Sequence, residues 1–168
     1  MTRTSLTHPL QIAAIRPYPG SGRIGITFCP GKKQPSAATG AWDRDLDVDV
    51  AAIAAWGASA VVTLVEGHEL RSLKVEGLGD AVRRHNMDWI HAPIPDGSIP
   101  GVGFERDWPV LGADLRARLR AGDDVVVHCK GGLGRAGTVA ARLMAEMGVP
   151  PREAIARVRQ ARPGAIET

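Results

Sequence analysis

The chain has 168 residues, of which 44% are hydrophobic and 23% charged, and its formal net charge is +3. That length suits one domain with a hydrophobic core, and we expect a single domain over residues 1–168. The small positive surplus forms no basic stripe with interleaved aromatic residues, so we predict no nucleic-acid partner. No apolar run approaches the roughly 20 residues that span a membrane.

The only cysteines, Cys29 and Cys129, are too few for a disulfide framework or a closed zinc site, so we expect a reducing, cytoplasmic setting. Cys29 is either a free, half-buried cysteine or a partner that resolves an oxidised Cys129. Residues 1–9 are polar, lack a signal peptide and are compatible with disorder. The preference for Arg over Lys, together with many alanines, is typical of a GC-rich bacterial genome.

The first half of the chain alternates short apolar segments with turns, which predicts three strands and one helix. The third segment is apolar throughout, as expected of a central parallel strand. Asp45 or Asp47 can cap the helix and Gly57 can end it, whereas residues 32–45 are expected to be a loop. The expected strands are residues 11–15, 23–28 and 60–65, and the expected helix is 46–56.

The second half continues the alternation and therefore predicts an α/β fold of three layers, with a mostly parallel central sheet flanked by helices. Three prolines between residues 93 and 100 exclude helix and central strand there, so this segment is a loop. The expected strands are 87–91 and 125–127; the expected helices are one or two within 70–86, one over 104–120, one ending at Gly148 and one from Pro150 to Arg162.

A glycine-rich turn, residues 129–135, separates the last strand from the next helix; we call it the glycine loop. Its three glycines are expected to supply positive φ angles, so that consecutive N–H groups converge on an anion in front of a helix N-terminus. This field and the Arg135 guanidinium favour the thiolate of Cys129. The loop thus predicts a nucleophile beneath an oxyanion cradle, with phosphate-binding residues Lys130, Gly131, Gly132, Leu133, Gly134 and Arg135.

His128-Cys129, five further residues and Arg135 resemble the signature loop of the cysteine-dependent protein tyrosine and dual-specificity phosphatases. Together with residues 24–32 and 162–168, the loop resembles the kinase-associated dual-specificity phosphatases and their bacterial relatives. The resemblance implies hydrolysis of phosphotyrosine, and of phosphoserine or phosphothreonine, in a phosphorylated protein. It implies a thiophosphoryl-cysteine intermediate, catalytic roles for Cys129 and Arg135, and no metal or cofactor.

Thiolate attack on phosphorus needs a proton donor for the leaving oxygen, and a carboxylic acid on a loop is the usual solution. Asp96 follows a strand expected to run parallel to the Cys129 strand, so both residues lie at carboxyl ends of strands, where α/β sheets bind ligands. Its place also matches the general acid of the resembled family. Asp107 is the alternative acid, and a turn with Gly97 is the alternative role for Asp96.

His128 and Thr138 are expected to support the loop. Neighbours on a strand point to opposite faces, so His128 is expected to hydrogen-bond the loop and not to deprotonate Cys129. Many resembled loops carry a Ser or Thr after the arginine that helps the cysteine leave, whereas this chain has Ala136. The glutamine that positions water in relatives would lie beyond Thr168. A phosphate-binding module without turnover is therefore an alternative.

Other functions fit the sequence less well. Residues 132–137 match a dinucleotide-binding GxGxxG pattern, but too few residues follow for further βαβ units. The glycines are not followed by the Lys-Ser or Lys-Thr of a phosphate-binding Walker loop, and rhodanese-type sulfurtransferases have a shorter cysteine loop. The histidines at positions 68, 85 and 91 lack metal-ligand spacing.

The substrate is less determined than the chemistry. Lys130 is shared with the phosphatase-and-tensin lipid enzymes, which makes a phosphoinositide phosphatase a further alternative, although those enzymes tend to carry a second lysine where this chain has Leu133. Pocket depth distinguishes phosphotyrosine from phosphoserine, and we expect the loops around residues 18, 32 and 70 to set it. The sequence does not indicate an oligomeric state.

Overall fold

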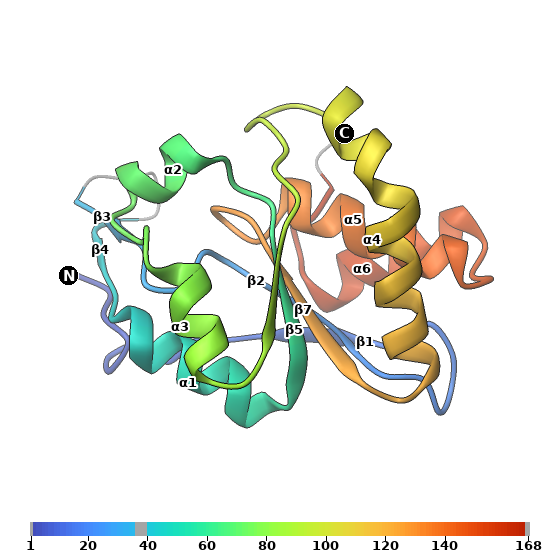
Figure 1. Cartoon of the computed structure of the whole chain (residues 1–168), viewed down its shortest axis with the longest axis horizontal. Helices are drawn as coiled ribbons and strands as arrows, with labels where there is room; N and C mark the ends of the chain where they lie inside the picture. Colours follow the sequence, from blue (N-terminus) through green and yellow to red (C-terminus); the bar gives the residue numbers. More distant parts are fainter. Residues whose placement is uncertain (1, 36–39, 167–168) are drawn as a thin grey trace.

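The computed structural model describes residues 2–35 and 40–166. A five-stranded sheet of order β1-β2-β7-β5-β6 lies between two layers of helices (Figure 1). Only β1 is antiparallel to its neighbour, so the predicted α/β fold with a mostly parallel sheet is confirmed. The sheet strands are Ala13–Ile15 (β1), Ile24–Thr27 (β2), Ala58–Thr63 (β5), Asp88–His91 (β6) and Asp124–His128 (β7).

The helices form one layer on each face of the sheet. α1, α2 and α3 contribute to one core, and α4, α5 and α6 to the other (Figure 1). Among the described residues, none of these helices is both long and apolar enough to cross a membrane. Their bounds are Leu46–Trp56 (α1), Gly67–Ser72 (α2), Leu78–Arg84 (α3), Val102–Arg120 (α4), Gly134–Glu146 (α5) and Pro151–Ala161 (α6).

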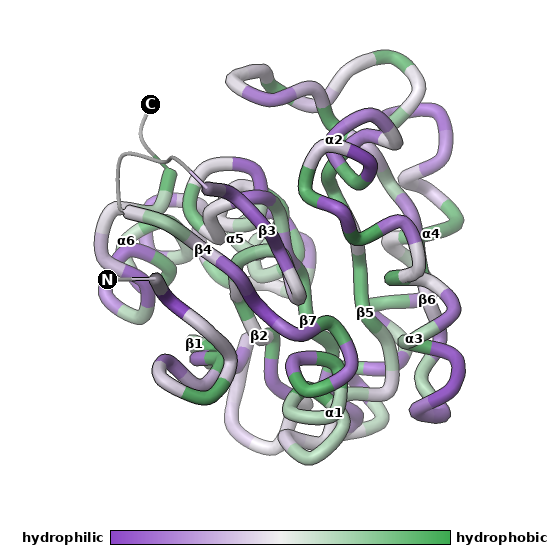
Figure 2. The backbone as a smooth tube through the Cα atoms, turned by 90° about the vertical axis from the view of Figure 1, so that its left-hand side faces the viewer, coloured by the Kyte–Doolittle hydropathy of each residue, from purple (hydrophilic) through white to green (hydrophobic). Residues whose placement is uncertain are grey.

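The central strands β5 and β7 are apolar because they are buried on both faces. Val126 of β7 points into the core under α1 and α3, whereas Val125 and Val127 point into the core under α4 and α5. In Figure 2 both strands carry the hydrophobic colour in the interior of the molecule. The four parallel strands end at the same edge of the sheet, so the segments that follow them meet there.

The predicted capping residues begin and end α1. The helix begins after Asp45, whose carboxylate accepts the Val48 N–H at 2.9 Å, and it ends at Gly57, which has φ 110°. The cap is therefore Asp45 and not Asp47. Gly57 relieves the strain that a side chain would suffer in the left-handed region.

The prediction of a loop over residues 32–45 is wrong in part. Lys33–Gln34 (β3) pairs with Trp42–Asp43 (β4) in a two-stranded antiparallel ribbon. The centre of the Phe28 ring lies 5.1 Å from that of the Trp42 ring, so a residue that precedes the ribbon packs against it. Glycine and proline near this segment argued for a loop, but contacts from distant residues stabilise short strands there.

The N-terminal segment is hydrogen-bonded to a buried ion pair at the start of α1. Arg44 donates to both carboxylate oxygens of Asp49, at 2.8 and 3.0 Å, and both side chains are buried. Asp49 also accepts the Ser5 hydroxyl at 2.9 Å and the Gly31 N–H at 2.8 Å. Residues 2–9, which the sequence leaves compatible with disorder, are thus anchored through the buried Ser5.

Replacing Asp49 with Ala should lower the free energy of unfolding by about 3–5 kcal/mol, because Arg44 would remain buried without a counter-charge. Asp47→Ala on the same helix is the matched control. Its carboxylate is exposed and pairs only at the surface, so we expect a much smaller loss than in Asp49→Ala. Urea unfolding of both variants measures the difference, and equal losses would contradict this account of the buried pair.

Candidate active site

The glycine loop connects the end of β7 to the start of α5 and lies directly against β2. Gly132 has φ +73°, and a Cβ on it would lie 2.6 Å from the Thr27 carbonyl carbon. A larger residue would push the loop off the strand. The expectation that all three glycines adopt positive φ is wrong: Gly131 and Gly134 do not, and Gly134 is the first residue of α5.

The carbonyl groups of the loop are held on its outer side. The Lys130 carbonyl accepts the Cys29 N–H at 3.2 Å and the Lys32 ammonium at 3.3 Å. The Gly131 and Gly132 carbonyls accept the Arg162 guanidinium at 3.1 and 3.2 Å. Because N–H and C=O point in opposite directions across a peptide plane, these bonds turn the N–H groups inward.

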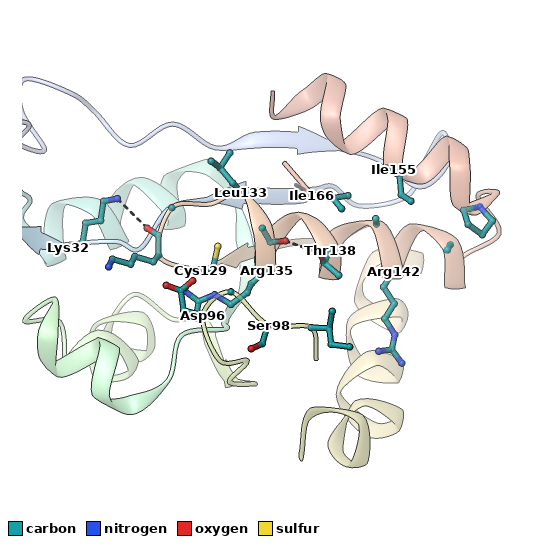
Figure 3. Close-up of a pocket in the computed structure, with 18 of the residues that line it drawn as sticks. Lys32, Asp96, Ser98, Cys129, Leu133, Arg135, Thr138, Arg142, Ile155 and Ile166 are labelled. Carbon is teal, nitrogen blue, oxygen red and sulfur yellow. Dashed lines mark hydrogen bonds and ion pairs between the residues drawn. The ribbon is translucent and has the colours of Figure 1, made fainter. Parts of the chain in front are cut away.

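Those inward N–H groups are available to a ligand. Within residues 2–35 and 40–166, the N–H groups of residues 130–135 have no hydrogen-bond acceptor. Backbone donors of this kind at a helix N-terminus form an anion-binding cup. Cys129 is buried at the base of the cup and lines the cavity in front of it (Figure 3).

Arg135 is held beside the cup by a carboxylate that sequence reasoning missed. Its guanidinium donates to both oxygens of Glu69, at 2.8 and 2.9 Å, and to the Ile94 carbonyl at 2.9 Å. Burial lowers the pKa of Arg135, but the Glu69 bonds outweigh it and raise that pKa above its usual value. The ion pair with Glu69 therefore keeps the Arg135 guanidinium charged and in one orientation.

Burial alone would raise the pKa of the Glu69 carboxyl, but the hydrogen bonds from Arg135 and from the Glu66 N–H hold it below its usual range. Glu69 thus stays ionised in mildly acidic solution. The sequence signal was Glu66-x-x-Glu69, a capping box at the start of α2. Nothing in the sequence indicated that this box would face Arg135, 66 positions away.

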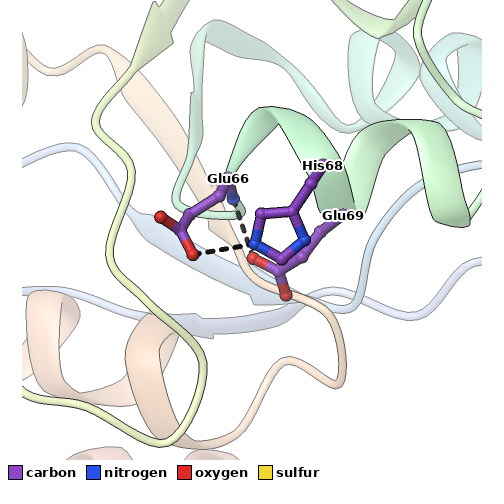
Figure 4. A group of neighbouring side chains, drawn as sticks. All are labelled: Glu66, His68 and Glu69. Atoms are coloured by element: carbon purple, nitrogen blue, oxygen red, sulfur yellow. Dashed lines mark hydrogen bonds and ion pairs between the residues drawn. The ribbon is translucent and has the colours of Figure 1, made fainter.

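Glu66, His68 and Glu69 have ligand atoms within 4.8 Å of one another, close enough to consider a metal (Figure 4). Hydrogen bonds explain why these three side chains lie together, without a metal ion. The Glu66 N–H donates to Glu69 at 2.8 Å, and His68 Nε2 lies 3.0 Å from the Glu66 carboxylate. Both Glu69 oxygens also bind Arg135, so the group forms a helix cap and an ion pair.

His128 is buried and links β5 to the glycine loop. Burial lowers its pKa to about 4, so the imidazole is neutral at pH 7. Its Nδ1 lies 3.1 Å from the Cys129 carbonyl, which only accepts, so Nδ1 carries the proton and Nε2 accepts from the Thr63 hydroxyl at 2.7 Å. Trp89 Nε1 donates to the same hydroxyl at 2.7 Å. The histidine thus bonds the loop backbone and not the Cys129 thiol.

Lys32 is a buried cation at the rim of the cup that sequence reasoning missed. Lys32 is only 5% exposed. Its Nζ lies 4.1 Å from the centre of the Trp42 ring and 4.9 Å from the centre of the Phe28 ring. Burial lowers the pKa of Lys32 to about 8. In the described chain no carboxylate pairs with it, so its ammonium contributes uncompensated positive charge near Cys129.

Cys29 is buried beneath the loop. Burial raises the pKa of its thiol to about 12, which keeps it protonated at neutral pH. A resolving cysteine attacks as the thiolate, so this environment favours the alternative of a free cysteine. Both cysteines are unbonded in the structure.

The two candidate acids lie in different places. Asp96 lines the same cavity as Cys129, with its side chain 67% exposed and one oxygen 3.4 Å from Arg135 (Figure 3). Asp107 lies on α4, pairs with the neighbouring Arg106 at 3.2 Å, and does not line the cavity. The structure therefore brings Asp96, and not Asp107, to the cysteine.

The cavity has a volume of about 760 Å³. Of the three loops expected to set its depth, the one at Lys32 borders it, and the segment around residue 70 lines a smaller cavity that shares Asp96 and Lys130 with it. Further walls come from the glycine loop, residues 96–99, α5 and α6. Thr138 also lines the cavity, and its hydroxyl donates to the Gly134 carbonyl at 2.9 Å. The other predicted loop residues on the cavity wall are Lys130, Gly131, Leu133, Gly134 and Arg135.

Comparison with known proteins agrees with this geometry. Residues 38–168 match the model of the DSP-PTPase phosphatase domain of Swiss Army Knife proteins. The chain belongs to this phosphatase family. Cyclin-dependent kinase inhibitor 3 of Rattus norvegicus is 31% identical over 148 residues, which cover 86% of this chain and 66% of that protein. The match thus spans just under two thirds of the relative.

Two solved structures are similar over nearly the whole chain. A kinase-associated phosphatase with its catalytic-site cysteine substituted by serine has a TM-score of 0.81 and 25% identity, covering 95% of this chain and 88% of that one. Tk-PTP in its active form has a TM-score of 0.65 and 33% identity, covering 93% and 88%. These relatives confirm the resemblance drawn from the glycine loop.

Glu69→Gln should weaken binding of tungstate, a tetrahedral oxyanion, by about 10- to 100-fold, because Arg135 would lose a charged partner and its fixed orientation. Glu66→Gln is the matched control: its side chain does not touch Arg135, so affinity should stay close to wild type. Titration calorimetry measures both. Unchanged tungstate affinity in Glu69→Gln would show that the ion pair does not prepare the site.

Proposed function

We propose that this protein hydrolyses phosphomonoesters of phosphorylated proteins, phosphotyrosine above all and also phosphoserine or phosphothreonine. The observation that supports this most is the cup of unpaired N–H groups around Cys129, with Arg135 fixed at its side. A phosphoryl group seated there would have its oxygens bound by backbone donors and the guanidinium fork. We place this activity in the cytoplasm, where free cysteines persist.

The reaction proceeds in two displacements. The Cys129 thiolate attacks phosphorus, the S–P bond forms, the P–O bond to the side chain breaks, and Asp96 gives its proton to the leaving oxygen. Water then attacks phosphorus and loses a proton to Asp96, while the S–P bond breaks and the thiolate returns. The N–H groups of residues 130–135 and Arg135 hold the phosphoryl oxygens in both steps.

A phosphate-binding module without turnover is the second candidate, and Ala136 is the residue that favours it. Ala136 is buried and offers no hydroxyl to the departing sulfur. The nearest hydroxyl along α5 is that of Thr138, which is engaged with the Gly134 carbonyl. Slow breakdown of the S–P bond would leave binding intact while turnover falls.

The deciding experiment measures release of a chromogenic alcohol from an aryl phosphate at mildly acidic pH. We expect turnover by the wild type and a loss of at least about 1,000-fold in Cys129→Ser, which removes the nucleophile. Asp96→Asn should lower turnover by about 100-fold, whereas Asp107→Asn should leave it close to wild type.

Three results would contradict the proposed function or its residue roles. Turnover that persists in Cys129→Ser would exclude cysteine catalysis, and no turnover by the wild type would favour the binding module. A larger loss in Asp107→Asn than in Asp96→Asn would reverse the assignment of the acid.

A further inference from the structure

The cavity extends well beyond the cup. From Arg135 it follows one face of α5 past Thr138 and Ala141 to Ala145, a distance of about 15 Å at 1.5 Å per helical residue. Figure 3 shows Lys32 at one end, Cys129 and Arg135 in the middle, and Ile155 toward the other end. A phosphoryl group occupies only the middle of this space.

The far part of the cavity is lined mainly by apolar side chains, and we call it the apolar arm. Ala141 and Ala145 leave room above α5, while α6 and the Asp96 loop supply larger aliphatic walls. Ile99 on that loop is 81% exposed, and Val102, three residues further on, is 87% exposed. Exposed aliphatic residues beside an apolar groove are typical of a binding surface. The apolar residues that line the arm are Ile99, Ala141, Ala145, Pro151 and Ile155, and Arg142 borders it as well.

We propose that the apolar arm binds a large aliphatic or aromatic side chain of the phosphorylated substrate, within about four residues of the phosphorylated one. An extended peptide advances about 3.3 Å per residue, so four residues cover about 13 Å, close to the distance of about 15 Å from Arg135 to the far end of the arm. The proposal rests on the proposed function, because the occupant of the arm is whatever is attached to the phosphoryl group in the cup.

The charges along the cavity favour a peptide over a lipid. A phosphoinositide would carry a second, diester phosphate between its headgroup and its acyl chains, and so would need a cation where the arm begins. Among the described residues lining that part, Arg142 is the cation, and its guanidinium is already bonded to Glu105 and Glu146. Lys32 lies on the opposite side of Cys129 from Arg142 (Figure 3) and is bonded to the Lys130 carbonyl.

The test measures binding of phosphotyrosine peptides to Cys129→Ser, which does not depend on turnover. In a peptide of Gly, Ser and Ala, a single Leu is moved through the four positions on each side of the phosphotyrosine. We expect one or two positions, on one side only, to tighten the dissociation constant about tenfold through burial of the Leu side chain.

A second substitution in the same protein locates the effect. We call the ratio of the dissociation constants without and with Leu the Leu advantage. Ala145→Glu places a charge in the arm and should reduce this ratio from about ten to about one. Ala156→Glu is the matched control, because Ala156 is exposed on α6 and does not line the cavity; it should retain the tenfold advantage. The advantage is a ratio within one variant, so a general loss of stability does not produce the expected result.

No Leu advantage at any position, or an advantage that persists in Ala145→Glu, would overturn the apolar arm. Tighter binding of a dioctanoyl phosphoinositide than of every peptide, lost in Ala145→Glu, would overturn the peptide as occupant. Absence of aryl phosphate turnover by the wild type would overturn the proposed function alone, since the Leu advantage in Cys129→Ser would still establish the arm.

Discussion

The site depends on the outward anchoring of the glycine-loop carbonyls. A peptide group whose C=O accepts a hydrogen bond on one side presents its N–H to the other, so the bonds from Arg162, Lys32 and the Cys29 N–H determine where the loop donors point. Within the described residues these N–H groups have no acceptor, so an oxyanion in the cup would accept several hydrogen bonds at once. Affinity for a tetrahedral anion is therefore built into the backbone before any ligand arrives.

The side chains around the loop extend the same preorganisation. Glu69 fixes the plane of Arg135, and the neutral His128 carries a hydrogen-bond chain from Trp89 and Thr63 to the Cys129 carbonyl. Donors fixed in this way do not have to reorganise when charge develops on the phosphoryl oxygens. Lys32 adds a buried charge whose lowered pKa shows that burial works against it. Its position fits a function at the site better than a contribution to folding.

The sequence predicts the parts of this protein that depend on local signals. The bounds and cap of α1, the proline-rich loop with Asp96, and the juxtaposition of Cys129 and Arg135 follow from spacing, capping and turn chemistry within short segments. Glu69, Arg162 and Lys32 were missed because each acts through a partner far along the chain. The β3–β4 ribbon was missed as well, because the glycines and the proline in and beside residues 32–45 predicted a loop. The positive φ of Gly132, and not of its neighbours, depends on the closeness of β2.

The most direct test of the central claim is a crystal structure of the protein with tungstate. We expect a tetrahedral oxyanion directly over Cys129 Sγ, with its oxygens bonded to N–H groups of residues 130–135 and to Arg135, while Arg162 and Lys32 still bind the loop carbonyls. An oxyanion bound elsewhere, or a loop whose carbonyls point into the cup when the anion binds, would contradict it.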